Sequence, residues 1–176
     1  AYIAVPRITS EAREYVPMTI LTEDVILNDK VSYGANGDLW LFGVLMSRVF
    51  NVWNKAISGR TRNDTLISNT VTYNNFPWPE NPKNKDAIEV AARAVLEIRQ
   101  KYPSSSLADL YDPHSMPKDL VNAHHALDRL VQTAYGLKSD AAEADILANL
   151  FTRYAELTAD LLTELPVKKT RKTKSD

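Results

Sequence analysis

The stretch "YNNFPWPENP", residues 73–82, divides this sequence into two parts of different character. Pro77, Pro79 and Pro82 each fix their own φ angle and restrict the residue that precedes them, so neither a helix nor a strand can run through this segment. We therefore predict a stiff joint here. Strand-like and helical patterns both occur before it, whereas only helical patterns occur after it.

The composition is that of a chain that can fold around a buried core. Of the 176 residues, 44% are hydrophobic and 24% are charged. Cysteine is absent, which excludes disulfides and thiolate metal sites and favours an intracellular, cytoplasmic origin. No apolar run approaches the roughly 20 residues that a membrane span needs. The start, "AYIAVPRITS", has no initiator Met and is not a signal peptide, so we interpret the sequence as a fragment of a longer protein.

The charged residues are distributed unevenly along the chain. Residues 1–76 carry seven Lys or Arg and seven Asp or Glu, whereas residues 77–167 carry nine against fourteen. Residues 168–176 carry five against one. The acidic second part is therefore a poor platform for phosphates. We interpret residues 166–176 as a disordered basic tail, and the alternative is a weak electrostatic arm on nucleic acid.

Before the joint, the sequence predicts short strands and one long helix. Residues 15–21 and 25–27 have strand-like composition and are followed by turn residues. From Leu39 to Ile57, apolar residues at helical spacing cover a wide surface, which predicts a helix buried on most sides. In "LISNTVTYNNF", residues 66–76, the alternation of larger side chains with Ser and Thr predicts another strand.

After the joint, the periodicity predicts helices joined by short loops. One helix spans about residues 86–101, "SSSLADLYDP" is a short helical turn with a Ser cap, and another helix begins at Pro117 and ends at Gly136. Asp140 with Glu143 resembles a capping box that opens the last helix. Such helices pack as a bundle. The predicted class is α+β, with a mixed strand and helix piece followed by an antiparallel helical bundle.

The joint also resembles a catalytic loop. Residues 75–78, "NFPW", differ at one position from the (Asn/Asp)-Pro-Pro-(Tyr/Phe/Trp) loop that amino-group DNA methyltransferases place against the target base. A methyltransferase also needs a cofactor site, normally a Gly-rich turn between a strand and a helix. The sequence has five glycines and no such turn. We therefore expect no catalytic residue and no bound cofactor in this chain.

Metal-dependent chemistry is not indicated either. Glu80 and Lys83 lie in a Pro-rich turn and do not have the spacing of a metal-dependent nuclease motif. His114, His124 and His125 contain no pair at i and i+4 that could ligate a metal. Because His124 shares the apolar face of its helix, we predict that it is a core histidine. We expect no metal site.

The remaining candidate is the polar segment "KAISGRTRNDTLISN", residues 55–69. Arg can bind guanine or phosphate, Asn can pair with adenine, and Asp can accept a hydrogen bond from the amino group of cytosine. These roles require an element that enters a groove of the DNA. On composition alone, a solvated surface loop is the alternative.

Two long segments now carry a resemblance: "FGVLMSRVFNVWNKAISGRTRNDTLISNTVTYNNFPWPENP" and "AIEVAARAVLEIRQKYPSSSLADLYDPHSMPKDLVNAHHALDRLVQTAYG". They resemble the C-terminal region of MmeI-like type IIG restriction–modification DNA methyltransferases, over roughly residues 13–162. In that family one polypeptide carries an endonuclease, an adenine methyltransferase and a DNA target-recognition domain. The resemblance implies that residues 1–78 are the distal part of the recognition domain and residues 79–165 the helical C-terminal domain.

The resemblance also implies what this chain does. It would bind double-stranded DNA and aim the methyltransferase domain of the same chain, without being an enzyme itself. S-adenosylmethionine and Mg²⁺ would bind elsewhere in the parent protein. The rival interpretation is a protein-interaction module that docks other domains or subunits. A truncated recognition domain could also form a homodimer through an exposed strand edge.

The candidate recognition residues match the family only partly. Ser58-Gly59-Arg60, Asp64 and Ser68 fit the family's "SGRLKSDYRYSN"-like run, and the positions between them differ. Because specificity positions are expected to vary, the departures imply a distinct recognition sequence. The resemblance implies a hinge between the recognition domain and the helical domain, formed by Phe76, Pro77, Trp78 and Pro79. The candidates for contact with DNA are Lys55, Ser58, Arg60, Arg62, Asn63, Asp64, Thr65, Ser68 and Asn69.

Overall fold

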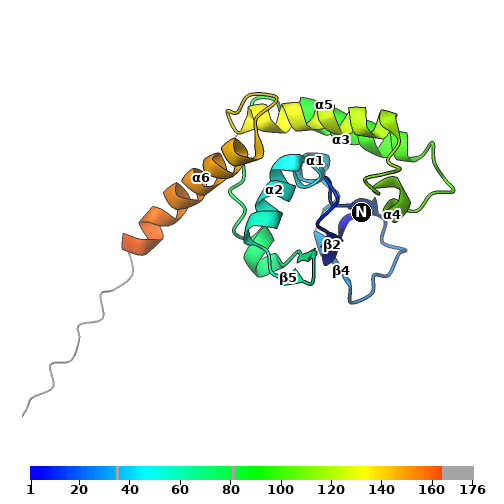
Figure 1. The fold of residues 1–176 in the computed structure, drawn as a ribbon, viewed down its shortest axis with the longest axis horizontal. Helices are drawn as coiled ribbons and strands as arrows, with labels where there is room; N and C mark the ends of the chain where they lie inside the picture. The colour runs from blue at the N-terminus through cyan, green and yellow to red at the C-terminus, as the bar shows by residue number, and fades with distance from the viewer. Residues whose placement is uncertain (35, 81, 164–176) are drawn as a thin grey trace, which may run out of the picture.

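The structure is a computed structural model that describes residues 1–34, 36–80 and 82–163, so the predicted basic tail at residues 166–176 lies outside the described residues. Figure 1 shows the small sheets and the helices α1 and α2 on one side of a pair of long helices, from which α6 leads away. The elements are β1 Tyr2–Pro6, β2 Ile8–Ser10, β3 Thr19–Leu21, β4 Val31–Gly34, α1 Leu39–Leu45, α2 Arg48–Ile57, β5 Arg60–Thr61, β6 Asp64–Leu66, η1 Asn69–Tyr73, α3 Lys85–Arg99, α4 Leu107–Leu110, α5 Lys118–Ala134 and α6 Glu143–Thr163.

Two three-stranded antiparallel sheets share one continuous segment of chain. β1 is the central strand of the sheet β3-β1-β4, and β2 is an edge strand of the sheet β2-β6-β5. Only Arg7 separates β1 from β2, and its carbonyl accepts a hydrogen bond of 2.9 Å from the backbone N–H of Ile67. The two sheets are therefore held in a fixed relation to each other.

The predicted strand at residues 25–27 is wrong. This segment lies in the loop between β3 and β4, and Ile26 is 95% exposed. Backbone turn bonds close this loop at both ends, from Val25 N–H to the Thr22 carbonyl and from Val31 N–H to the Asn28 carbonyl. Turn formation on either side thus overrides the β propensity of three residues.

The predicted single helix over residues 39–57 is also wrong, because the chain turns a corner between α1 and α2. Ser47 at the corner is extended, with φ −83° and ψ 159°, and its hydroxyl caps the new helix at the Phe50 N–H. The carboxylate of Asp128, on α5, accepts a second hydrogen bond, from the Arg48 N–H at 2.7 Å. The apolar spacing continues across the corner, so the periodicity does not reveal it.

The strand predicted within residues 66–76 is replaced by a π-helical turn, η1. The Ser68 hydroxyl accepts a hydrogen bond from the Val71 N–H, and the Thr72 hydroxyl accepts one from the Ser68 N–H. Such local side-chain bonds compete with a strand ladder for the same backbone groups. Extended structure therefore stops at Leu66, where β6 ends.

The second half of the chain is helical, as predicted, and the α+β class is confirmed. Near one end of the α3–α5 pair, the Asn84 amide donates to the Leu130 carbonyl at 2.8 Å. Near the other end, the Tyr102 hydroxyl donates to the Asp119 carboxylate at 2.8 Å. The two helices are therefore antiparallel. The predicted Ser cap of the short helix α4 is Ser106, which forms a full capping box.

The last helix packs mainly on α2. α6 begins at Glu143, three residues after Asp140, so the helix starts later than the predicted capping residue. Trp53 of α2 contacts α6 through Phe151 and Tyr154, with ring centroids 5.5 and 5.8 Å apart. The helix α2 is thus covered by α6 as well as by elements of the first half of the chain.

The joint between the two halves is packed with aromatic rings. Phe76 is buried and meets Phe50 edge to face at 5.3 Å and Trp78 at 4.9 Å. Trp78 also meets Trp40 of α1 at 5.9 Å. The Pro-rich segment is therefore fixed on the body by its own aromatic side chains.

A close approach of helices forms the centre of the core. A Cβ atom at Gly43 of α1 would lie 2.9 Å from Cγ2 of Ile88 on α3 and 3.4 Å from Leu127 on α5. No larger residue fits at this position without a shift of its neighbours. Through this contact, the first half of the chain packs closely against the α3–α5 pair.

A chain of polar groups runs through this core. The buried Arg99 donates to the Met18 carbonyl at 2.6 Å and to the Tyr111 hydroxyl, which in turn bonds His124 Nε2 at 2.7 Å. Burial lowers the pKa of His124 well below its ordinary value. The prediction of a core histidine is confirmed, because His124 is fully buried and stacks on Tyr15.

The carboxylate of Asp128 lies on the other side of Tyr15, the ring that stacks on His124. Only 5% of the residue is exposed, and its carboxylate accepts hydrogen bonds of 2.7 Å from the Tyr15 hydroxyl and the Arg48 N–H. Burial raises the pKa of Asp128 to about 6, and the two hydrogen bonds partly oppose this rise. Folding therefore favours the protonated form of this side chain.

Replacing Asp128 with Asn should remove this titration. For a carboxyl whose pKa is raised by folding, the stability that the proton contributes is present below the unfolded pKa, about 4, and is lost as the pH rises through about 6. We expect the free energy of unfolding of the wild type, relative to that of Asp128→Asn, to fall by about 2 kcal/mol between about pH 4 and pH 7. Urea unfolding across this range measures the difference, with the exposed Asp140→Asn as the control. A difference that stays constant with pH would contradict the prediction.

Candidate nucleic-acid interface

The polar segment predicted to touch DNA folds as a tight β-hairpin. β5 and β6 pair antiparallel with Arg60 opposite Thr65 and Thr61 opposite Asp64, so Arg62 and Asn63 form a two-residue turn. Both turn residues are exposed. The hairpin extends from the end of α2, on the side of the molecule away from the α3–α5 pair (Figure 1).

Buried polar side chains hold the base of the hairpin. The amide of Asn54, on α2, donates to the Thr65 hydroxyl at 3.1 Å, and that hydroxyl donates to the Thr9 carbonyl. The Ser58 hydroxyl donates to the Asn54 side-chain oxygen at 2.5 Å and also meets the Thr72 hydroxyl. Because Thr65 is only 1% exposed, its side chain faces the protein. Two of the predicted site residues, Ser58 and Thr65, therefore serve to hold the hairpin in this structure.

The backbone at the turn is strained. Arg62 has φ +59°, in the left-handed region, and it occupies the first position of a two-residue hairpin turn, where glycine is usual. Among the described residues, the Arg62 side chain has no hydrogen-bond or ion-pair partner that would offset this strain. A charged side chain kept at a strained, exposed position is typical of a binding residue.

The other arginine of the hairpin is held by a carboxylate. Arg60 Nη1 lies 2.6 Å from Oε2 of Glu11, and both side chains are close to half exposed. The hydrogen bond and the charge of Arg60 lower the pKa of Glu11. To contact a phosphate, Arg60 would have to leave Glu11. The Glu11 carboxylate therefore competes with an anionic ligand for the guanidinium of Arg60.

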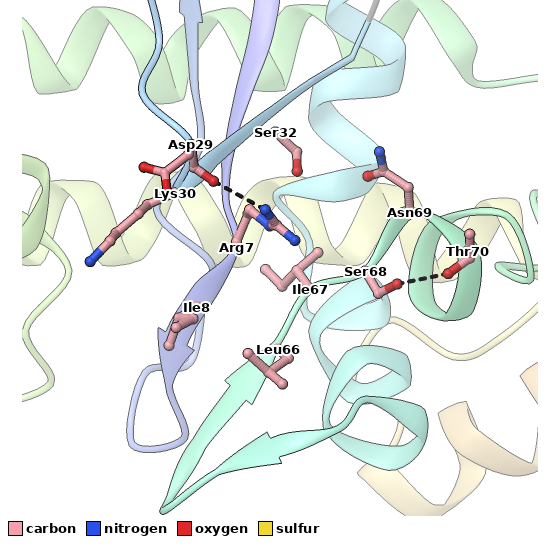
Figure 2. Close-up of a pocket in the computed structure, with 10 residues that line it drawn as sticks. All are labelled: Arg7, Ile8, Asp29, Lys30, Ser32, Leu66, Ile67, Ser68, Asn69 and Thr70. Atoms are coloured by element: carbon pink, nitrogen blue, oxygen red, sulfur yellow. Dashed lines mark hydrogen bonds between the residues drawn. The ribbon is translucent and has the colours of Figure 1, made fainter.

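A groove of about 870 Å³ lies beside the hairpin. One wall is formed by the segment around Arg7 and Lys30, and the other by the start of η1 (Figure 2). Arg7 reaches across the first wall, and its guanidinium donates to the Asp29 carbonyl at 3.1 Å. The residues that line the groove are Arg7, Ile8, Asp29, Lys30, Ser32, Leu66, Ile67, Ser68, Asn69 and Thr70.

The structure brings the predicted residues together on one side of the molecule. Arg60, Arg62 and Asn63 are exposed on the hairpin, Asp64 is half-buried in it, and Lys55 is half-buried near the end of α2. Ser68 and Asn69 stand on the groove wall at η1 instead. The sequence reasoning missed Arg7, Lys30, Ser32 and Thr70. The first three lie more than thirty residues before Ser68 on the opposite wall of the groove, so no local spacing signals them.

The loop that resembles a methyltransferase motif is occupied by contacts within the protein. The Asn75 amide nitrogen donates to the carbonyls of Thr70 and Val71, at 2.8 and 3.0 Å. Phe76 is buried in the aromatic cluster at the joint. This arrangement ends η1 and anchors the joint.

The described part of the chain, residues 1–34, 36–80 and 82–163, shows neither a metal cluster nor a membrane-spanning helix. No group of three or more His, Asp or Glu side chains in it is placed to hold a metal ion. No helix in it is both long and apolar enough to cross a membrane.

Comparisons with known proteins identify the class to which this fold and surface belong. Residues 1–80 match the model of the MmeI target recognition domain, and residues 80–162 match the model of the MmeI C-terminal domain. The chain therefore belongs to the MmeI family and carries these two domains in succession. The resemblance drawn from the sequence is confirmed.

Two individual relatives extend this finding. DNA methyltransferase A of Bacillus subtilis (strain 168) is 37% identical over 157 residues, which are 89% of this chain. The solved structure of the type IIL restriction–modification enzyme MmeI in complex with DNA matches 90% of this chain with a TM-score of 0.85 and 36% identity. The chain spans 18% of the length of the first protein and 21% of the second.

The strain at Arg62 can be tested by substitution with glycine. Glycine adopts the left-handed conformation without cost, so Arg62→Gly should leave the free energy of unfolding unchanged or raise it by up to about 1 kcal/mol. Asn63→Gly is the matched control. Its backbone is not left-handed, so the added freedom of the unfolded chain should lower stability by about 0.5–1 kcal/mol. If urea unfolding shows equal losses for the two variants, Arg62 is not strained.

Proposed function

We propose that this chain reads the DNA target sequence for a site-specific DNA methyltransferase. Residues 1–78 serve as the distal part of the target recognition domain, and residues 79–165 support it as the helical C-terminal domain. The observation that carries the proposal is the exposed hairpin with two arginines beside a polar groove, within residues that match a target recognition domain. The complex of the related MmeI with DNA supports double-stranded DNA as the ligand.

The hairpin has the dimensions and side chains for direct readout. The major groove of B-DNA is about 12 Å wide and admits a two-stranded ribbon. Arg62, at the tip, can bind a guanine edge or a phosphate, whereas Asn63 and Asp64 suit adenine and cytosine. Arg60 would bind a phosphate after leaving Glu11.

The groove supplies the second part of the proposed interface. Arg7 and Lys30 on one wall would contact phosphates, which position the duplex but carry no sequence information. Ser68, Asn69 and Thr70 on the other wall present hydroxyl and amide groups for base edges. Lys55 would add a phosphate contact behind the hairpin. Ser58 and Thr65 contribute by holding the hairpin in place.

The catalytic parts of the enzyme belong to the rest of the parent protein. We infer an adenine-N6 methyltransferase domain that binds S-adenosylmethionine, together with an endonuclease that uses Mg²⁺. The recognition domain would aim this methyltransferase at its target base. The basis of this inference is the similarity to DNA methyltransferase A and to the restriction–modification enzyme MmeI.

A second role for the helical part is supported by one observation. Phe151 and Leu157 on α6 are each about half exposed among the described residues, at 45% and 53%. Because α6 leads away from the α3–α5 pair (Figure 1), these apolar side chains leave surface on it that another domain can cover. We propose that α6 docks the methyltransferase domain of the same protein. The test is Leu157→Ser, because Phe151 also packs on Trp53. A Leu157→Ser variant that behaves as the wild type under limited proteolysis of the complete protein would exclude this role.

Base readout by the hairpin can be tested by substitution in the complete parent protein. We expect Arg62→Ala and Asp64→Ala to relax the sequence preference at one or two base pairs, each by roughly 1–3 kcal/mol, with little change in melting temperature. Single-molecule sequencing of methylated genomic DNA reports the preference, and Arg129→Ala on the exposed face of α5 is the control. An unchanged methylation motif with a lowered melting temperature would reject the proposal.

The competition at Arg60 gives a separate test. Glu11→Gln removes the carboxylate that holds Arg60, so binding to duplex DNA should strengthen, by up to about fivefold, the upper limit for an exposed ion pair. Glu97→Gln, on the exposed side of α3, changes the net charge equally and should have little effect. Fluorescence anisotropy with a labelled duplex measures both. Equal effects of the two variants would show that Arg60 does not touch the DNA.

A further inference from the structure

The contact between Asp128 and α2 links the helical domain to the candidate recognition hairpin. Asp128 lies near the middle of α5. Its carboxylate accepts a hydrogen bond from the N–H of Arg48, the first residue of α2. The same carboxylate accepts the hydroxyl hydrogen of Tyr15, from the segment between β2 and β3. A single buried side chain of the C-terminal domain therefore meets two separate segments of the first half.

The helix α2 can transmit a displacement at its start to the hairpin at its end. It has ten residues, which corresponds to a length of about 15 Å, and most of its residues are buried, in contact with α1, α5, α6 and η1. Its first turn is fixed by Asp128 and its own cap Ser47, and Asn51 in the middle donates to the Arg13 and Glu14 carbonyls. A helix packed on all sides moves as a rigid body, so a shift at its start reaches its end.

At the far end of α2, side-chain bonds connect directly to the hairpin and to the groove wall. Asn54 holds Thr65 in β6, and Ser58 joins Asn54 to Thr72 of η1. The Leu66 N–H also donates to the Gly59 carbonyl at 2.9 Å. The hairpin and η1 are thus both fixed on the last turn of α2.

These contacts form one path from the helical domain to the proposed DNA-reading surface. We propose that Asp128 is a positioning residue for DNA recognition: it fixes the start of α2 and thereby sets the placement of the hairpin and the groove wall at its other end. The inference rests on the proposed function, since it concerns the same DNA-reading surface. It gives the C-terminal helical domain a part in sequence discrimination without any contact with DNA.

The test is a selection of sequences from a randomised duplex pool by the complete parent protein. Asp128→Ala removes the acceptor and leaves the Arg48 N–H and the Tyr15 hydroxyl buried without a partner. Asp128→Asn keeps an acceptor oxygen in a side chain of the same shape, so it should retain the sequence preference that Asp128→Ala loses. Leu120→Ala removes a fully buried side chain from the same helix, two turns away, and serves as the control for general destabilisation. Should Asp128→Ala not fold, Asp128→Ser is the milder replacement.

The expected result is a tenfold or greater loss of enrichment of the preferred sequence for Asp128→Ala, with Asp128→Asn and Leu120→Ala close to the wild type. Without DNA, hydrogen exchange should become faster in the hairpin of Asp128→Ala and not in that of Leu120→Ala. Equal enrichment for Asp128→Ala and the wild type, or equal losses for Asp128→Ala and Leu120→Ala, would overturn the positioning role alone. If the wild type itself enriches no sequence, the proposed function fails and this inference falls with it.

Discussion

The corner between α1 and α2 is the constraint on which the rest of the structure depends. The apolar pattern runs without a break from Leu39 to Ile57, yet the helix stops at Leu45 and restarts at Arg48. The buried carboxylate of Asp128 satisfies the N–H of Arg48, which would otherwise lose its helical partner inside the core. Because of this corner, α1 packs against the α3–α5 pair while α2 carries the hairpin away from it. A tertiary contact from eighty residues further along the chain thus stabilises a local break in a helix.

The parts of the fold that the sequence predicts are those fixed by local rules. The helices after the joint, the Ser cap of α4, the Gly136 end of α5 and the burial of His124 all follow from periodicity and capping chemistry. The wrong predictions share one physical cause, competition from bonds that the pattern does not show. In η1, hydroxyls of Ser68 and Thr72 take the backbone donors that a strand would use, and at the α1–α2 corner the competing acceptor comes from α5.

The candidate site was predictable only in its contiguous part. Arg60, Arg62, Asn63 and Asp64 stand together in the sequence, and a segment rich in such side chains is recognisable by composition and by the family resemblance. The wall of the groove at Arg7 and Lys30 lies just beyond the ends of the paired strands β1 and β4, and no spacing in the sequence brings it to the hairpin. Composition also predicts contact residues that burial excludes, namely Thr65, which faces inward, and Ser58, which is half-buried. Residue type suits them for DNA, but burial assigns them to the support of the hairpin.

The proposed function depends above all on one contact, that of the β5–β6 hairpin turn with the bases of the target. The most direct measurement places a photo-crosslinking amino acid at Asn63 in the complete protein and maps the crosslinked nucleotides on a duplex that carries the methylated sequence. The same amino acid at Glu97, on the exposed face of α3, is the reference. If the turn lies against the bases, position 63 will crosslink to defined bases within the recognised sequence and position 97 will not crosslink. Crosslinks from position 97 alone, or none from position 63 at full occupancy of the duplex, would contradict this contact.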